Sequence, residues 1–226
     1  KKNDIIFDID FDNDFLGKKS KHEIINYRFI VIDGFIESVG EIHHLLHTAA
    51  TEKEPYVIFC FGMSDEVKKT ILENNSRNIT EIFPAVINFN EQTVNILNDI
   101  AVLHDSEVIS ALKGQTISQE IRKDLPIGKK IIFYRSKIIV SPVCSKIKID
   151  AHRNFLNQRI REAATDTNIE VITKRLKYFN SKTLEAFIPE KILNDISKNR
   201  ELDYVFRFFS NIEKIMCTVE IEDKKI

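Results

Sequence analysis

The sequence predicts an α/β fold, a layered sheet with flanking helices, followed by a mostly helical segment. Up to about residue 141, short β-branched runs alternate with amphipathic stretches of 11 to 16 residues, which is typical of strands joined by crossover helices. After residue 145 the pattern becomes helical, and Gly128 is the last glycine. We therefore predict one domain over residues 1–145 and a helical domain over residues 146–226.

The predicted strands are β-branched and aromatic runs bounded by turn residues. Two such runs on either side of Arg135, Ser136 and Lys137 predict a hairpin over residues 129–142. The other predicted strands are "IIFDIDF" (5–11), "YRFIVID" (27–33), "PYVIFCF" (55–61), "IFPAVINF" (82–89) and "EVIS" (107–110).

The predicted helices follow from apolar residues at helical spacing. Ser64 is placed to cap the second of them, with Asp65 and Glu66 in its first turn. "TDTN" (165–168) supplies the turn of a helical hairpin over residues 150–179. The other predicted helices cover residues 35–50, 65–75, 92–104, 189–198 and 200–215, and a strand "IMCTVEI" (215–221) follows.

Composition excludes several classes of protein. Hydrophobic residues make up 43% and charged residues 30%, as in globular proteins. Lys plus Arg (33) nearly balances Asp plus Glu (34), so no net field favours nucleic acid or an anionic membrane. No apolar run is long enough to span a membrane. The three widely spaced cysteines form no Cys-x-x-Cys pair, so we expect a reduced, cytoplasmic setting and neither a nucleic-acid nor a membrane partner.

The run "EIHHLLHTAA" (41–50) raises the possibility of a metal site. His43 and His47 are four residues apart, a spacing that lets two imidazoles share one metal ion on a helix. No recognised third ligand accompanies them, and H-E-x-x-H is absent. Gly-rich phosphate loops and G-x-S-x-G elbows are also missing. His104–Asp105 resembles a base with its orienting carboxylate, but neighbours in sequence at a helix end usually cap or solvate it. We therefore assign no metal ligand and no catalytic residue.

The same helix carries more apolar surface than one sheet contact needs. Its apolar arc spans about 160°, against the roughly 100° that seats a helix on a sheet. The arc is built from Phe35, Val39, Ile42, His43, Leu45, Leu46, Ala49 and Ala50. Unless another part of the domain covers it, the side formed by Val39, His43, Leu46 and Ala50 stays partly exposed. With Leu72 of the next helix, it predicts a shallow groove for an apolar peptide.

The segment "ILNDIAVLHDSEVIS" (96–110) resembles part of the apical domain of GroEL-type group I chaperonins. Further stretches resemble the same family in the same order, so the resemblance covers about residues 5–180. They are "FDIDFDNDFL" (7–16), "FIVIDGFIESVGEIHHLLHTAATEKEPYVIF" (29–59), "ISQEIRKDLPIGKKIIFYRSKIIV" (117–140) and "LNQRIREAATDTNIEVITKRLKYF" (156–179).

The resemblance implies an apical domain followed by the returning half of an intermediate domain. In that family, the apical domain binds non-native polypeptide and the mobile loop of a co-chaperonin in a groove between the two helices. The corresponding positions are Phe11, Asn13, Phe15, Leu16, His43, Leu46, Lys68, Leu72 and Glu73. His43, Lys68 and Glu73 replace apolar residues of the family, so we expect a more polar groove with a narrower clientele.

The resemblance also bears on assembly and on ATP. A complete family member forms a homo-oligomeric ring and binds ATP and Mg²⁺ in an equatorial domain, which has no counterpart in this sequence. The family's hydrolytic aspartate aligns loosely with Asp203, and Tyr204 is an equal match. We expect the chain as given to bind no cofactor and to hydrolyse no ATP.

Three functions follow, in this order of preference. The first is chaperonin-type binding of non-native polypeptide, by apolar burial and without covalent chemistry. The alternative is an interaction or assembly module that kept the fold but recognises one folded partner. The third and least favoured hypothesis is a metal-dependent enzyme.

Overall fold

The computed structural model describes residues 4–17, 19–180 and 207. The described residues up to 180 belong to one compact unit. The helices predicted over 189–198 and 200–215 and the strand predicted over 215–221 lie outside the described residues, apart from Arg207, which is helical. The division into two domains at residue 145 stays a prediction.

Strands and helices alternate over most of the described chain, as the sequence predicts. The strands are β1 (Ile5–Asp8), β2 (Lys21–Asp33), β3 (Phe35–Ile36), β4 (Pro55–Cys60), β5 (Gly62–Met63), β6 (Glu81–Val86), β7 (Ile109–Ser110), β8 (Ile127–Tyr134) and β9 (Lys137–Ser141). The helices are α1 (Val39–Glu52), α2 (Asp65–Ser76), α3 (Glu91–Leu103), the 3₁₀ turn η1 (Ala111–Lys113), α4 (Ile117–Glu120), α5 (Lys146–Glu162) and α6 (Asp166–Asn180).

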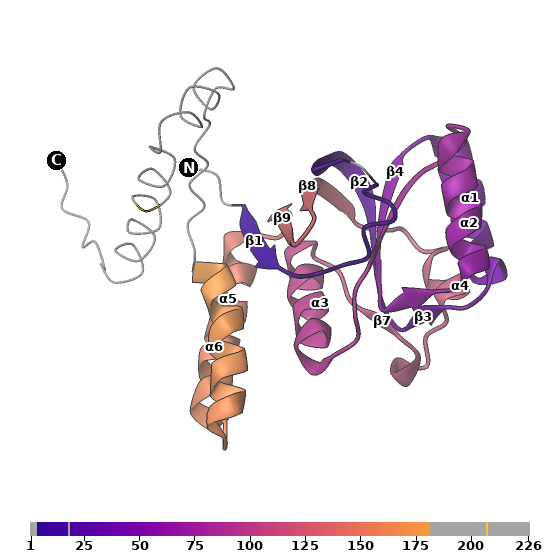
Figure 1. Ribbon diagram of the computed structural model, residues 1–226. Coiled ribbons are helices and arrows are strands. Elements are labelled where there is room, and N and C mark those ends of the chain that lie inside the picture. Colours follow the sequence, from indigo (N-terminus) through magenta and orange to yellow (C-terminus); the bar gives the residue numbers. More distant parts are fainter. Residues whose placement is uncertain (1–3, 18, 181–206, 208–226) are drawn as a thin grey trace. The chain divides into compact units, whose positions relative to one another are not determined.

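One mixed sheet organises these elements (Figure 1). Its strand order is β1-β9-β8-β2-β4-β6, and β7 pairs with the end of β2. The β1/β9, β9/β8 and β8/β2 pairs are antiparallel, whereas β2/β4, β4/β6 and β2/β7 are parallel. The short strands β3 and β5 form a separate parallel pair.

Side chains of β2 alternate between two hydrophobic cores. Phe29 and Val31 pack into one core, and Ile30 and Ile32 pack into the other, as the two-residue period of a strand requires. The first core also holds residues of α3, α5 and α6, and the second holds residues of α1 and α2. Helices therefore cover both faces of the sheet.

A buried charge cluster fixes the α5–α6 hairpin to α3. The carboxylate of Asp99 is fully buried and accepts two hydrogen bonds from Arg175, at 2.8 and 2.9 Å. His152 lies 2.7 Å from the same carboxylate, and the amide oxygen of Asn95 accepts from Arg175 at 3.0 Å. A buried carboxylate needs such partners, since leaving it unpaired would cost several kcal/mol. The cluster thus ties one residue of α3 to both helices of the hairpin.

The structure confirms the α/β class and corrects several element boundaries. The predicted helix over 35–50 begins only at Val39, because Phe35 and Ile36 form β3. The carboxylate of Glu41 accepts from the backbone N–H groups of Glu37 and Ser38, at 2.8 and 3.3 Å, and this capping fixes the start of the helix. Strand β2 begins six residues earlier than predicted, at Lys21 instead of Tyr27, and β5, η1 and α4 were not predicted.

A buried aromatic cluster forms where β2, β8 and α3 meet. The ring of His104 stacks on Phe29 with centroids 3.7 Å apart. Its Nδ1 lies 2.8 Å from the carbonyl of Ile100, so this nitrogen carries the proton, and Nε2 accepts from the hydroxyl of Tyr27 at 2.6 Å. His104 is the C-cap of α3, as one of the two interpretations of the sequence predicts, but its ring is not solvated, since only 1% of the residue is exposed.

The ring of Tyr27 lies directly over Gly128, its partner in β8. A Cβ at position 128 would come within 2.2 Å of the ring, far inside van der Waals contact. Only glycine fits there without displacing the ring.

In the described part of the chain, no helix is long and apolar enough to cross a membrane.

We predict that Gly128→Ala lowers the free energy of unfolding by about 1–3 kcal/mol, because overpacking displaces Tyr27 and its bond to His104. The matched control is Gly40→Ala in α1, where the nearest atom to a new Cβ is 3.6 Å away. That variant should be more stable by up to about 1 kcal/mol, the usual preference for alanine inside a helix. Urea unfolding measures both, and equal stability of Gly128→Ala and wild type would contradict the prediction.

Burial lowers the pKa of His104 to about 4, outweighing the hydrogen bond to Ile100, which raises it. The unfolded chain binds a proton near pH 6.5, but the folded chain does not until about pH 4. The free energy of unfolding should therefore fall as the pH drops between these values, by about 3 kcal/mol from this group. His104→Gln should lose this component, and the exposed His44→Gln should keep it. Identical pH slopes for wild type and His104→Gln would refute this assignment.

Candidate functional site

Helix α1 seats one face on the sheet and leaves another partly open. Ile42, Leu45 and Ala49 are at most 1% exposed, so the buried face is centred closer to Leu45 than the sequence pattern suggests. The next side of the helix, which carries Val39, Leu46 and Ala50, is only half-buried. This is the arc that the sequence predicts to be partly uncovered.

Part of the apolar excess on this side of the sheet is covered by α4, a segment the sequence pattern missed. Helix α4 contacts α1, and Ile117 and Leu125 pack against the same core as Val39 and Leu46. This segment comes about 70 residues after α1, so the local sequence pattern around α1 cannot predict the contact. The side of α1 that carries Val39, Leu46 and Ala50 is left half-buried.

Helix α2 lies beside α1 on the same face of the sheet (Figure 1). The hydroxyl of Ser64 accepts from the backbone N–H of Val67 at 3.3 Å, so the predicted cap is confirmed. Val67 and Ile71 are fully buried against the sheet. Leu72, one position further, is 40% exposed and presents apolar surface to solvent.

The N-terminal segment packs along β6 and places two predicted site residues in the core. Phe11 forms an isolated bridge with Ile87 and is 5% exposed, and Leu16 is 2% exposed. The backbone N–H of Asp12 donates to the carbonyl of Val86 at 2.8 Å. Phe15 is half-buried. Of Phe11, Phe15 and Leu16, only Phe15 therefore has accessible surface that a ligand could contact.

Lys68 of α2 holds the N-terminal segment through two carboxylates. Its ammonium pairs with Asp12 and lies 3.2 Å from Asp14. The hydrogen bond to Asp12 raises the pKa of Lys68 above its ordinary value. Burial alone would raise the pKa of Asp12, but its bonds to Lys68 and to the backbone of Asp14 lower it overall. Lys68 therefore links α2 to the N-terminal segment.

Sequence reasoning missed both acidic partners of Lys68. In "FDNDF" (11–15), Asp12 and Asp14 alternate with Phe11, Asn13 and Phe15, which are positions that the family resemblance selects. In an extended segment, residues two apart point to the same side. Nothing local, however, connects them with a lysine more than fifty residues away.

The remaining polar positions are at the surface. His43, Asn13 and Glu73 are exposed, and Glu73 forms an ion pair with Arg77 one helical turn away, at 2.5 Å. His44 and His47 are exposed as well. Among the described residues, no group of three or more His, Cys, Asp or Glu side chains is placed to hold a metal ion.

We call the partly exposed apolar positions of the two helices, Val39, Leu46, Ala50 and Leu72, the α1–α2 surface. The structure brings these four residues onto two adjacent helices of one sheet face. His43 and Lys68 border them on the same helices. Phe11 and Leu16 do not belong to this surface, because their side chains are in the core.

Comparison with known proteins places the fold in one class. No family model matches the sequence. Among solved structures, the architecture is similar to that of a chaperonin, so the described unit has a chaperonin-like fold.

The particular structure is the chaperonin gp146 from the bacteriophage EL 2 (Pseudomonas aeruginosa), solved in the presence of ATP-BeFx. The TM-score is 0.61 at 12% sequence identity, and the match covers 79% of this chain. It covers 36% of the chaperonin chain, so this sequence spans about a third of that protein's length.

Proposed function

We propose that this chain binds non-native polypeptide through the α1–α2 surface, in the manner of a chaperonin apical domain. The observation that carries the proposal is the open apolar side of α1 next to the exposed Leu72 of α2, within a chaperonin-like fold. Unfolded chains expose apolar side chains, and burying them against such a surface releases water. No covalent chemistry is required.

The expected affinity of one such surface is low. A fully buried leucine contributes about 1.5–3 kcal/mol, and Leu46 and Leu72 have only part of their area left to bury. Weak contacts become effective when several copies act together. The proposal therefore includes a homo-oligomeric ring in the cytoplasm, with a co-chaperonin as a further partner. ATP and Mg²⁺ would belong to other parts of a complete protein, and Asp203 and Tyr204 lie outside the described residues.

The polar border of the surface favours a second candidate function. Lys68 is engaged by Asp12 and Asp14, and Glu73 by Arg77, where the family has apolar residues. Fixed charges around a small apolar patch suit one complementary partner better than many unfolded ones. This candidate is a module that recognises a single folded protein. A pulldown that yields one stoichiometric partner, with no affinity for denatured proteins, would favour it over the first.

We predict that Leu46→Glu combined with Leu72→Glu lowers suppression of a denatured protein's aggregation at least severalfold, because charges replace two apolar side chains that would contact the client. Light scattering of a chemically denatured client, diluted into the chain, measures the effect. Leu72→Glu alone, at the more exposed position, should give an intermediate loss.

The matched control is Ile147→Glu combined with Phe155→Glu on α5. These side chains are 80% and 51% exposed, so the control removes more exposed apolar surface than the test variant. It should suppress aggregation like wild type. Equal activity of wild type, the Leu46→Glu/Leu72→Glu variant and the α5 control would disprove the assignment to α1 and α2, provided that circular dichroism shows all three to be folded.

A further inference from the structure

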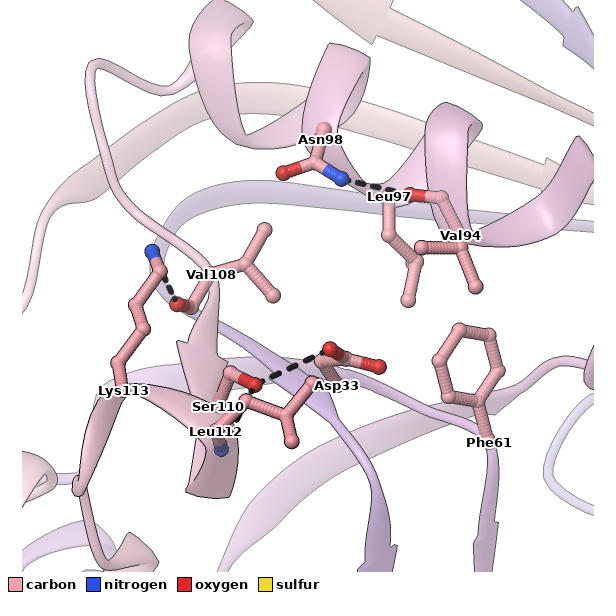
Figure 2. Close-up of a pocket in the computed structure, with 9 residues that line it drawn as sticks. All are labelled: Asp33, Phe61, Val94, Leu97, Asn98, Val108, Ser110, Leu112 and Lys113. Atoms are coloured by element: carbon pink, nitrogen blue, oxygen red, sulfur yellow. Dashed lines mark hydrogen bonds between the residues drawn. The ribbon is translucent and has the colours of Figure 1, made fainter. Parts of the chain in front are cut away.

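A pocket of about 200 Å³ lies at the carboxyl ends of β2, β4 and β7 (Figure 2), and none of the residues that line it belongs to the α1–α2 surface. Phe61, Leu97 and Val108 supply apolar walls, and Asp33 and Ser110 supply polar groups. Leu97 comes from α3, which packs on the sheet face opposite to α1 and α2. The pocket and the proposed polypeptide surface therefore use different residues and different faces.

The strand topology places the pocket at a position where ligands commonly bind in sheets with parallel strands. The parallel strands lie in the order β6-β4-β2-β7. From β2 the chain passes through α1 and α2 to β6 on one side, and it returns through α3 to β7 on the other. The direction of winding thus reverses beside β2. In open sheets with parallel strands, ligands bind outside the carboxyl ends of the strands at such a reversal.

The size and charge of the pocket restrict the ligand. At about 30 Å³ per water-sized group, 200 Å³ holds roughly seven such groups. Cofactor and drug sites usually measure about 300–1,000 Å³, so this pocket does not enclose a nucleotide. The carboxylate of Asp33 would also repel a phosphate. Lys113 also lines the pocket, but its ammonium is directed to the carbonyl of Val108 and lies 3.9 Å from the carboxylate of Glu107. The unpaired charge in the pocket is therefore that of Asp33, which favours a small ligand without negative charge.

The hydrogen bonds leave one strong acceptor open. The hydroxyl of Ser110, a residue only 5% exposed, donates to one oxygen of Asp33 at 3.1 Å and accepts from the backbone N–H of Leu112 at 3.3 Å. The other oxygen of Asp33 points toward Phe61 (Figure 2), and no described side chain or backbone group donates to it. The ammonium of Lys113 is directed to the carbonyl of Val108, at 3.2 Å.

We propose that this pocket binds a protonated alkylamine. The ammonium group would donate to the open oxygen of Asp33, and the alkyl chain would lie against Phe61, Leu97 and Val108. Ser110 holds the carboxylate in place, so little ordering is needed on binding. The exposed Leu112 stands at the rim, 94% accessible, and can close over the alkyl chain. The amine can be a free small molecule or the side chain of a lysine in a polypeptide.

The test is an NMR titration of the ¹⁵N-labelled chain at pH 7 with n-pentylamine and, separately, with 1-pentanol. The two probes have nearly the same shape and differ in charge. Saturable shifts are expected at the amides of Asp33, Ser110 and Leu112, with the amine bound at least about tenfold more tightly, as a charge-assisted hydrogen bond provides. Asp33→Asn keeps an acceptor for Ser110 and should bind both probes about equally.

Asp10→Asn, which removes an exposed acid elsewhere, should keep the preference for the amine. If Asp33→Asn fails to fold, the two probes on wild type decide. Equal binding of both probes by wild type, a preference that survives Asp33→Asn, or unsaturable shifts spread over surface acids would each overturn the proposal. Saturation by Nα-acetyl-lysine N-methylamide at the same amides would identify a polypeptide lysine as the source. Saturation by the free amine alone would identify a small molecule.

Discussion

Strand β2 is paired along both edges, and its second half is buried on both faces. These two constraints set the positions of the other elements. Its first half pairs with β8, and its second half pairs with β4 and β7. Phe29 and Val31 enter one core while Ile30 and Ile32 enter the other, so a shift of one residue would exchange the two cores. The close fit of Tyr27 over Gly128 allows no such shift.

The helices on the two faces of the sheet are held by different interactions. On one face, α1 and α2 are seated by a few buried residues each, and the apolar area left over is the surface that we propose for polypeptide. On the other face, the buried Asp99 joins α3 to the α5–α6 hairpin through Arg175 and His152. This face is fixed by charges that need one another, and it also contains the pocket beside Asp33.

Much of the described architecture could be predicted from local patterns, whereas the pairings could not. Periodicity and capping residues located α2, α3 and β4 to within a residue or two, because Ser64 and the apolar spacing act locally. The family resemblance indicated the chaperonin-like fold, and the solved structure of a phage chaperonin supports it at the level of the fold. By contrast, the partners of Asp99, Lys68 and His104 lie about fifty to eighty residues away. Only the tertiary structure shows that Phe11 and Leu16 are core residues.

We propose that the open side of α1 and the adjacent position on α2 bind unfolded chains. Leucine methyl spectra of the chain, recorded with and without a permanently unfolded, reduced and alkylated protein, test it most directly. We predict shifts or broadening of the methyl signals of Leu46 and Leu72, with those of the buried Leu103 and Leu156 unchanged. Unchanged signals of Leu46 and Leu72 at a saturating concentration of the unfolded protein would contradict it.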